Sequence, residues 1–198
     1  TVIRENRFVG DRMSIWGDFP GTDGLIVENL FVGTGLGLHN NPGQCIVSRN
    51  RFYTPAVLPA ILVDSVQNAI VTENEIFNAK YGIQVWDGCH NCIIANNRIS
   101  SHAHPTGPAI DVYTNTGPKP ESDGIMVVNN LISGFGVGVR ITGANNLVAG
   151  NTILTTTTPI KIIGSDPIVR GNVGYATETT GAAASTADGG TIAHGCAA

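Results

Sequence analysis

The chain has 198 residues and a formal net charge of −4; only 13% of its residues are charged, and 25 are glycine. This balance gives no electrostatic footprint for nucleic-acid binding, and no apolar run is long enough for a transmembrane helix. We therefore expect one elongated domain with no nucleic-acid partner and no membrane insertion. Thr1 already lies inside a repeated phrase, so we expect the natural protein to continue on its N-terminal side.

A short phrase containing an asparagine recurs along the chain. Its copies are VIRENRF (Val2–Phe8), LIVENLF (Leu25–Phe31), CIVSRNRF (Cys45–Phe52), AIVTENEI (Ala69–Ile76), CIIANNRI (Cys92–Ile99), IMVVNNLI (Ile125–Ile132), NLVAGNTI (Asn146–Ile153) and PIVRGNVG (Pro167–Gly174). The anchor asparagines are Asn6, Asn29, Asn50, Asn74, Asn97, Asn130, Asn151 and Asn172, separated by steps of 23, 21, 24, 23, 33, 21 and 21 residues. This near-constant period predicts a solenoid of about eight coils.

The alternation inside each repeat predicts strands rather than helices. Apolar and polar residues alternate within every copy, which is the strand period. Between the anchors lies a second phrase of the form apolar–x–apolar: Leu36-Gly37-Leu38, Ile61-Leu62-Val63, Ile83-Gln84-Val85, Ile110-Asp111-Val112, Val137-Gly138-Val139 and Ile160-Lys161-Ile162. Each repeat thus has at least two strands joined by turns, and strands of successive repeats should stack in parallel at roughly 4.8 Å.

The asparagine column has an architectural interpretation. Asparagine tolerates the left-handed backbone of a tight corner, and amides stacked from coil to coil can bond as a ladder. Glu5, Glu28, Arg49 and Glu73 precede four of the anchors and form a charged column on another face. We predict that the anchors stabilise the corners and take no part in catalysis.

These repeats resemble the right-handed parallel β-helices of the pectate-lyase-like class over roughly Thr1 to Gly174. That class includes pectin-degrading enzymes, epimerases and phage tailspikes, so the resemblance implies an all-β solenoid without fixing its chemistry. An Ala/Thr/Gly-rich segment follows at 175–198. The phrases Gly174–Glu178 and Thr191–Gly195 resemble a stretch that follows the β-helix in phage tail and receptor-binding proteins. This second resemblance implies a tailspike-like homotrimer with virion tail components as partners, located in the virion tail or outside the cell.

The four cysteines give no metal or redox motif. Cys45 and Cys92 both lie five residues before their anchors, so we expect them in one column as small core residues. Cys89 and Cys92 form CHNC, but a metal site needs a second ligand pair that the sequence lacks. No residues form an oxygen-rich calcium cage either. We therefore expect no metal and no cofactor, and the disulfide state of Cys89, Cys92 and Cys196 stays open.

Two columns of the second strand phrase should face solvent on one sheet. The residues just after each triplet are Trp16, His39, Asp64, Trp86, Tyr113 and Arg140, and the middle residues are Gly37, Leu62, Gln84, Asp111, Gly138 and Lys161. Aromatic rings can stack on sugar faces, while charged groups bind hydroxyls or uronates. We predict a saccharide-binding face here, with cover of a subunit interface as the alternative.

Three aspartates of this face are candidate catalysts. Glycoside hydrolysis needs two carboxyl groups about 5.5 Å apart for retention, or about 6.5–9.5 Å apart for inversion. The backbones of Asp64 and Asp87 should lie roughly 6 Å apart, and those of Asp64 and Asp111 roughly 11–12 Å apart. We take Asp64, Asp87 and Asp111 as the acid/base set. Asp64 and Asp111 should be exposed, whereas Asp87 breaks the strict alternation and its direction stays open.

One repeat is longer than the others by about ten residues, between Asn97 and Asn130. It adds two loops that carry His102, His104, Glu121 and Asp123 and that should lie beside Asp111 and Tyr113. Insertions in solenoids often lie on the binding face, so His102 and His104 join the predicted substrate contacts. A tolerated surface insertion is the alternative.

Three functions fit the sequence. The first is a tailspike-like β-helix that binds a bacterial surface polysaccharide and can depolymerise it, as a glycoside hydrolase or lyase. The second is a secreted polysaccharide lyase, hydrolase or epimerase of cellular origin. The third is a structural or adhesive β-helix without catalysis. The sequence names neither the sugar nor the reaction.

Overall fold

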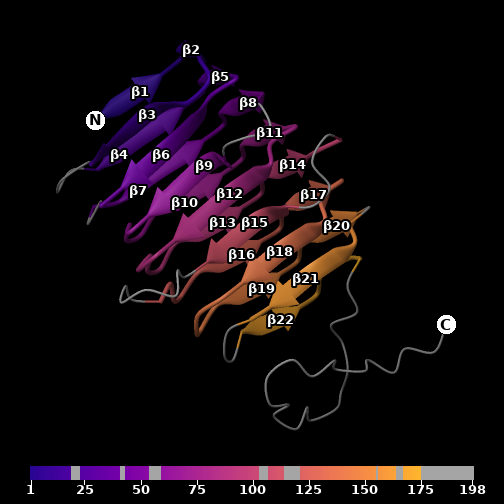
Figure 1. Cartoon of the computed structure of the whole chain (residues 1–198). Coiled ribbons are helices and arrows are strands. Elements are labelled where there is room, and N and C mark those ends of the chain that lie inside the picture. The colour runs from indigo at the N-terminus through magenta and orange to yellow at the C-terminus, as the bar shows by residue number, and fades with distance from the viewer. Residues whose placement is uncertain are drawn as a thin grey trace, which may run out of the picture.

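The computed structural model describes residues 1–18, 23–40, 43–53, 59–102, 107–113, 121–154, 156–163 and 167–174, apart from the side chains of 16–18. These parts contain β-strands and no helix, so nothing in them has the form of a membrane-spanning helix. The strands are stacked into an elongated solenoid, with β1 near one end and β22 at the other (Figure 1). His104, Cys196 and the segment 175–198 lie outside the described residues.

Each complete coil contributes one strand to each of three parallel sheets. Sheet A has eight strands: β1 (Val2–Arg4), β4 (Gly24–Val27), β7 (Cys45–Ser48), β10 (Ile70–Thr72), β13 (Ile93–Ala95), β16 (Met126–Val128), β19 (Leu147–Ala149) and β22 (Ile168–Arg170). Sheet B has seven: β2 (Arg7–Val9), β5 (Leu30–Val32), β8 (Arg51–Tyr53), β11 (Glu75–Phe77), β14 (Arg98–Ser100), β17 (Leu131–Ser133) and β20 (Thr152–Leu154). Sheet C also has seven: β3 (Met13–Asp18), β6 (Gly35–His39), β9 (Pro59–Asp64), β12 (Tyr81–Trp86), β15 (Pro108–Tyr113), β18 (Val137–Ile141) and β21 (Thr158–Ile162). The predicted parallel stacking is confirmed.

The interior is built from repeat positions that superpose from coil to coil. On sheet B, Phe31 stacks on Phe52 with ring centroids 4.5 Å apart, and the column continues through Ile76 and Ile99. Burial of these side chains removes apolar surface from water, which one coil could not achieve alone. Cys45 and Cys92 lie in the same interior column and are buried free thiols, as predicted.

The prediction of about eight coils is too high, because about six coils have a complete buried interior. At the N-terminal end, Ile3, Phe8 and Ile15 are only partly buried. At the other end the last repeat forms β22 and an isolated bridge from Thr152 to Val173, but no strand of sheet C within the described residues. Among the described residues, the first and last repeats pack against a neighbouring coil on one side only, and Ile3, Phe8, Ile15 and Val169 are partly buried.

The predicted asparagine ladder is present at the corner between sheets A and B. The backbone N–H and Nδ2 of Asn29 both donate to Oδ1 of Asn50, at 2.9 and 3.0 Å. The same pair of bonds joins Asn50 to Asn74, and the ladder runs on to Asn172. The side-chain amides also donate to backbone carbonyls of the same corner, so the buried polar groups are satisfied.

The left-handed residue of this corner is not the asparagine itself, which corrects the predicted reason for the column. Positive φ angles occur one residue earlier, for example 59° at Glu28 and 53° at Arg49. The corner turns at that position, so its side chain points to solvent while the following asparagine points inward. The anchor asparagine therefore serves as a hydrogen-bonding residue and not as the turn residue.

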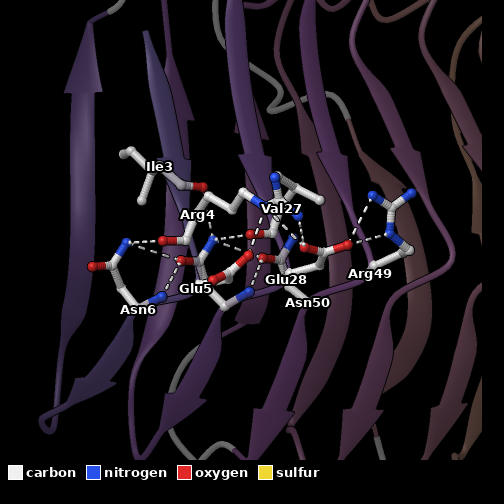
Figure 2. Close-up of polar contacts among 9 residues, drawn as sticks. Ile3, Arg4, Glu5, Asn6, Val27, Glu28, Arg49 and Asn50 are labelled. Atoms are coloured by element: carbon white, nitrogen blue, oxygen red, sulfur yellow. Dashed lines mark hydrogen bonds and ion pairs between the residues drawn. The ribbon is translucent and has the colours of Figure 1, made fainter.

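Two members of the charged column before the anchors, Glu28 and Arg49, form an ionic chain with Arg4 on the outside of the corner (Figure 2). Glu28 accepts hydrogen bonds from Arg4 Nε and from Arg49 Nε, each at 3.0 Å. These two arginines hold the pKa of Glu28 below its ordinary value. The three side chains are solvent-accessible, so we assign them a structural role of small energetic weight.

Candidate functional site

The strand pairing of sheet C defines two columns of outer positions, but their register differs from the predicted one. Pairing of the strands places Trp16, Gly37, Leu62, Gln84, Asp111, Arg140 and Lys161 in one column. Asp18, His39, Asp64, Trp86 and Tyr113 form the other. The sequence pattern placed Arg140 and Trp16 in the column that contains His39 and Asp64. The strand pairing places both in the column that contains Asp111. In β18 the inward pair is Val139 and Ile141, not Val137 and Val139.

Asp111 is fully buried, which corrects the expectation that it is exposed. Arg140 donates to both of its carboxylate oxygens at 2.6 Å, through Nε and Nη2. Gln84 Nε2 donates to the same carboxylate at 3.1 Å from the preceding coil. The hydrogen bonds to Asp111 raise the pKa of Arg140. The guanidinium also lies 4.9 Å from the centre of the Tyr113 ring. Asp111 is thus held as an ion-paired carboxylate.

His39 and Asp64 form the nearest pair of proton-transfer groups on this face. His39 Nε2 lies 3.4 Å from Asp64 Oδ2, and Ser65 Oγ donates to Asp64 Oδ1 at 3.0 Å. Asp64 is largely buried, contrary to expectation, whereas the His39 side chain is 27% exposed. A carboxylate beside an imidazole can orient the ring and stabilise its protonated form. The arrangement suits acid–base chemistry at His39.

Asp87, whose direction the sequence left open, is a corner residue and is buried. Its φ of 33° is left-handed, and Asn40 and Ser65 have positive φ at the same position of neighbouring coils. The backbone N–H of each of these residues donates to the strand-end carbonyl of the next coil, as from Asp87 to Tyr113. A short polar side chain is favoured at such a corner. The corner position accounts for an aspartate at residue 87 without a catalytic role.

Trp86 and Tyr113 lie side by side on neighbouring strands, as the predicted column requires. Both side chains are partly buried. The indole Nε1 of Trp86 is buried and has no hydrogen-bond partner among the described residues. An indole N–H usually finds a partner when it is buried. Since Arg140 covers Tyr113, Trp86 is the better stacking platform of the two.

The long repeat places its polar residues at opposite ends of β15. His102 is exposed and precedes the strand, and its backbone N–H donates to Asn78 Oδ1 at 3.2 Å. Glu121 and Asp123 follow the strand. His102 therefore lies before β15 in the chain, and Asp123 lies after it. His104 lies outside the described residues.

Sequence reasoning missed a pair formed by His90 and Asp123. His90 Nδ1 is hydrogen-bonded to Asp123 Oδ1, and both side chains are partly exposed. Isolated bridges place Gln67, His90 and Asp123 at one position of successive coils. The step from His90 to Asp123 is 33 residues, the same as from Asn97 to Asn130. This equal spacing was the sequence signal that could have revealed the pair. The pair fixes the point at which the long loop rejoins the solenoid.

Within the described ranges, no three His, Cys, Asp or Glu side chains converge as a metal site would require. The polar groups of sheet C instead form pairs, His39 with Asp64 and Asp111 with Arg140. Together with Trp86 they form one continuous outward surface over β6, β9, β12, β15, β18 and β21. We name this surface the sheet C face.

Comparison with known proteins agrees with this architecture. The model of the family described as "Right handed beta helix region" matches residues 2–99 and 59–196, and the chain belongs to this family of right-handed β-helices. A solved structure with a similar fold is the A-module of the mannuronan C-5 epimerase AlgE6 from Azotobacter vinelandii. The TM-score is 0.56 and the identity 18%, over 87% of this chain and 57% of that module. The likeness therefore concerns the fold, and the chain spans little more than half of the module. Comparison with curated proteins gave no sequence match.

Proposed function

We propose that this chain is a polysaccharide-acting β-helix that binds its glycan along the sheet C face. The observation that carries the proposal is the alignment of an aromatic platform with paired polar groups on successive strands. Trp86 lies between Asp64 and Tyr113 in one column, and Asp111 and Arg140 lie in the adjacent column. A saccharide presents apolar faces and many hydroxyls, which suits rings flanked by polar groups. The fold of a mannuronan epimerase module supports the same substrate class.

For catalysis, we propose His39 with Asp64 as the proton-transfer pair. His39 is accessible and lies 3.4 Å from the carboxylate that orients it. Asp111 and Asp87 stay candidates, but both are less suited to proton transfer. Arg140 occupies both oxygens of Asp111, and Asp87 forms a left-handed corner. The proposal covers reaction classes that move a proton on a sugar, which include hydrolysis, elimination and epimerisation.

As to biological setting, we propose a tailspike-like protein that acts on a bacterial surface polysaccharide. The resemblance of Gly174–Glu178 and Thr191–Gly195 to tail and receptor-binding proteins supports this setting. Homotrimer formation, virion tail partners and a virion or extracellular location belong to the same proposal. A secreted enzyme of cellular origin is the second candidate, supported by the fold of the epimerase module. A virion-attachment domain encoded upstream would favour the tailspike, and a secretory signal the enzyme.

A glycan-binding screen tests the proposal. The chain is tested against capsular, O-antigen and uronate polysaccharides, with Trp86→Ala as the site variant and Tyr53→Ala as its control. Tyr53 is an exposed aromatic residue on the outer side of sheet B. We expect Trp86→Ala to lose at least about 1 kcal/mol of binding free energy, since a stacking platform is removed. Equal affinity of Trp86→Ala and the unaltered chain would place the site on another face. Light scattering of the same samples reports the oligomeric state.

A further inference from the structure

We propose that Arg140 and Lys161 form a subsite for a carboxylate on the glycan, and that Asp111 is the residue that positions Arg140. This inference rests on the proposed function and specifies the chemistry of one part of the sheet C face. The two cations are register partners on β18 and β21, which places their backbones roughly 4.8 Å apart.

The orientation of Arg140 leaves one edge of its guanidinium available. Nε and Nη2 are bound to the two oxygens of Asp111, each at 2.6 Å. Nη1 has no hydrogen-bond partner among the described residues, and the Arg140 side chain is 27% exposed. Because guanidinium is planar, the Asp111 pair fixes the direction of the remaining Nη1 edge. That edge can donate to a second carboxylate, which is the geometry of specific recognition.

Lys161 supplies the second cation without a competing anion. Lys161 is exposed, and its side chain makes no ion pair within the described part of the chain. The Asp111 carboxylate offsets one positive charge, so the cluster of Arg140, Lys161 and Asp111 carries a net charge of about +1 at neutral pH. Since Asp111 is fully buried, a ligand contacts the cations and not this anion. A cationic subsite on a chain of net charge −4 is a local feature of the sheet C face.

The neighbouring aromatic residues set the place of the sugar ring. Arg140 lies over the Tyr113 ring, so a ring face of Tyr113 is occupied by the guanidinium. Trp86 lies one strand before Tyr113 and is the platform for a sugar stacked beside the subsite. A glycan along the solenoid axis would then place a sugar on Trp86 and a carboxylate of a following sugar at Arg140 and Lys161. An acidic polysaccharide with a carboxylate on the sugar fits this arrangement.

Matched polymers test the subsite. The probes are polymannuronate and polygalacturonate, their carboxyl-reduced neutral counterparts, and dextran sulfate beside dextran. The site variant is Lys161→Gln, and Arg98→Gln is the control because Arg98 is exposed on sheet B. We expect at least one uronate polymer to bind about tenfold or more tightly than its neutral counterpart. Lys161→Gln should remove most of this preference, and Arg98→Gln should retain it.

Asp111→Asn tests the positioning role, with Arg140→Lys beside it. Both variants should lower the ratio of uronate affinity to neutral-polymer affinity by about fivefold or more, with affinity for the neutral polymer retained. A purely structural role of Asp111 would weaken binding of both polymers together. Circular dichroism shows whether each variant is folded. If Asp111→Asn does not fold, Lys161→Gln still tests the subsite.

Four outcomes would overturn the subsite. The first is equal binding of uronate and neutral polymers, and the second is an equal loss in Arg98→Gln and Lys161→Gln. The third is dextran sulfate binding as tightly as the uronate polymers, which would indicate attraction to any polyanion. The fourth is binding of neutral glycans alone: if Trp86→Ala abolishes it, the proposed function stands while the subsite fails. Absence of binding to every glycan would defeat both proposals.

Discussion

Asn74 binds one oxygen of Asn97 twice, since its backbone N–H and its Nδ2 both donate to Asn97 Oδ1 at 3.0 Å. Its own Oδ1 accepts the same two bonds from Asn50, and its amide also reaches the carbonyls of Val47 and Thr72. All of this occurs in the interior, where Asn74 is 1% exposed. One side chain thereby satisfies the polar groups of three successive coils.

Asn74→Leu should therefore destabilise the fold. The substitution leaves buried donors and acceptors without partners, and we expect a loss of about 1–3 kcal/mol in the free energy of unfolding. Chemical denaturation measures this loss. Glu73→Gln is the control, because Glu73 is exposed one residue earlier and should change stability by less than about 0.5 kcal/mol. A neutral result for Asn74→Leu would contradict the ladder as a stabilising element.

Two left-handed glycines should differ in their tolerance of alanine. The φ angles of Gly134 and Gly171 are 75° and 60°, so alanine at either position costs about 1–2 kcal/mol of backbone strain. A Cβ at Gly134 would also collide with the carbonyl oxygen of Ser101, while a Cβ at Gly171 would have no described atom within 4 Å. Gly134→Ala should therefore lower the denaturation midpoint clearly more than Gly171→Ala. Equal midpoints would show that the corner at Gly134 can widen without cost.

Asp64→Asn should slow any reaction that proceeds through His39. The amide keeps the shape of the side chain but removes the carboxylate that lies 3.4 Å from Nε2 of His39. We expect a rate loss of roughly a hundredfold or more on a glycan that the screen identifies as a substrate, and His39→Gln should match it. Glu121→Gln makes the same change at an exposed site and should leave the rate unaltered. Full activity of Asp64→Asn would remove the pair from catalysis.

Cys45 should make stability fall in alkaline solution. Burial raises the pKa of this thiol from an ordinary value of 9.0 to about 11. The folded state holds the proton more tightly, so the contribution of Cys45 is complete below pH 9 and is lost as the pH rises towards 11. Two pKa units correspond to up to about 3 kcal/mol.

Cys45→Ala isolates this contribution of the thiol. The variant has a smaller side chain and will be less stable overall, but its unfolding free energy should decline less steeply between pH 9 and pH 11. Denaturation at several pH values in a reducing buffer gives the two slopes. Identical slopes for the variant and the unaltered chain would show that the thiol of Cys45 is not responsible.

The sequence predicted those parts of the fold that every coil repeats. Interior columns and the asparagine ladder recur at each step, so an error in one repeat is corrected by the others. The register of β18 has no such support, because Val137, Val139 and Ile141 alternate over five residues and fit two frames. Gly138 has no side chain to show its direction, so the sequence pattern favoured the wrong frame.

The candidate site was predictable only in part. The order of His39, Asp64, Trp86 and Tyr113 along one column followed from the repeat. The burial of Asp111 did not, because it depends on Arg140 reaching back by one coil to bind both carboxylate oxygens. A residue on the outer side of a sheet is normally read as exposed, and a long side chain from the next strand reverses that expectation.

The pairing of each coil with its neighbours also allows the sheet C face to change in length by one coil at a time. Every pair of strands in the three sheets joins neighbouring coils, so the strand pairing of the described residues needs no fixed separation between distant repeats. Duplication or deletion of one repeat would preserve each interior column and each corner. It would lengthen or shorten the sheet C face by roughly 4.8 Å. If this face binds a glycan as proposed, the number of coils sets the length of polymer that it can contact, and that number can change without a new interior.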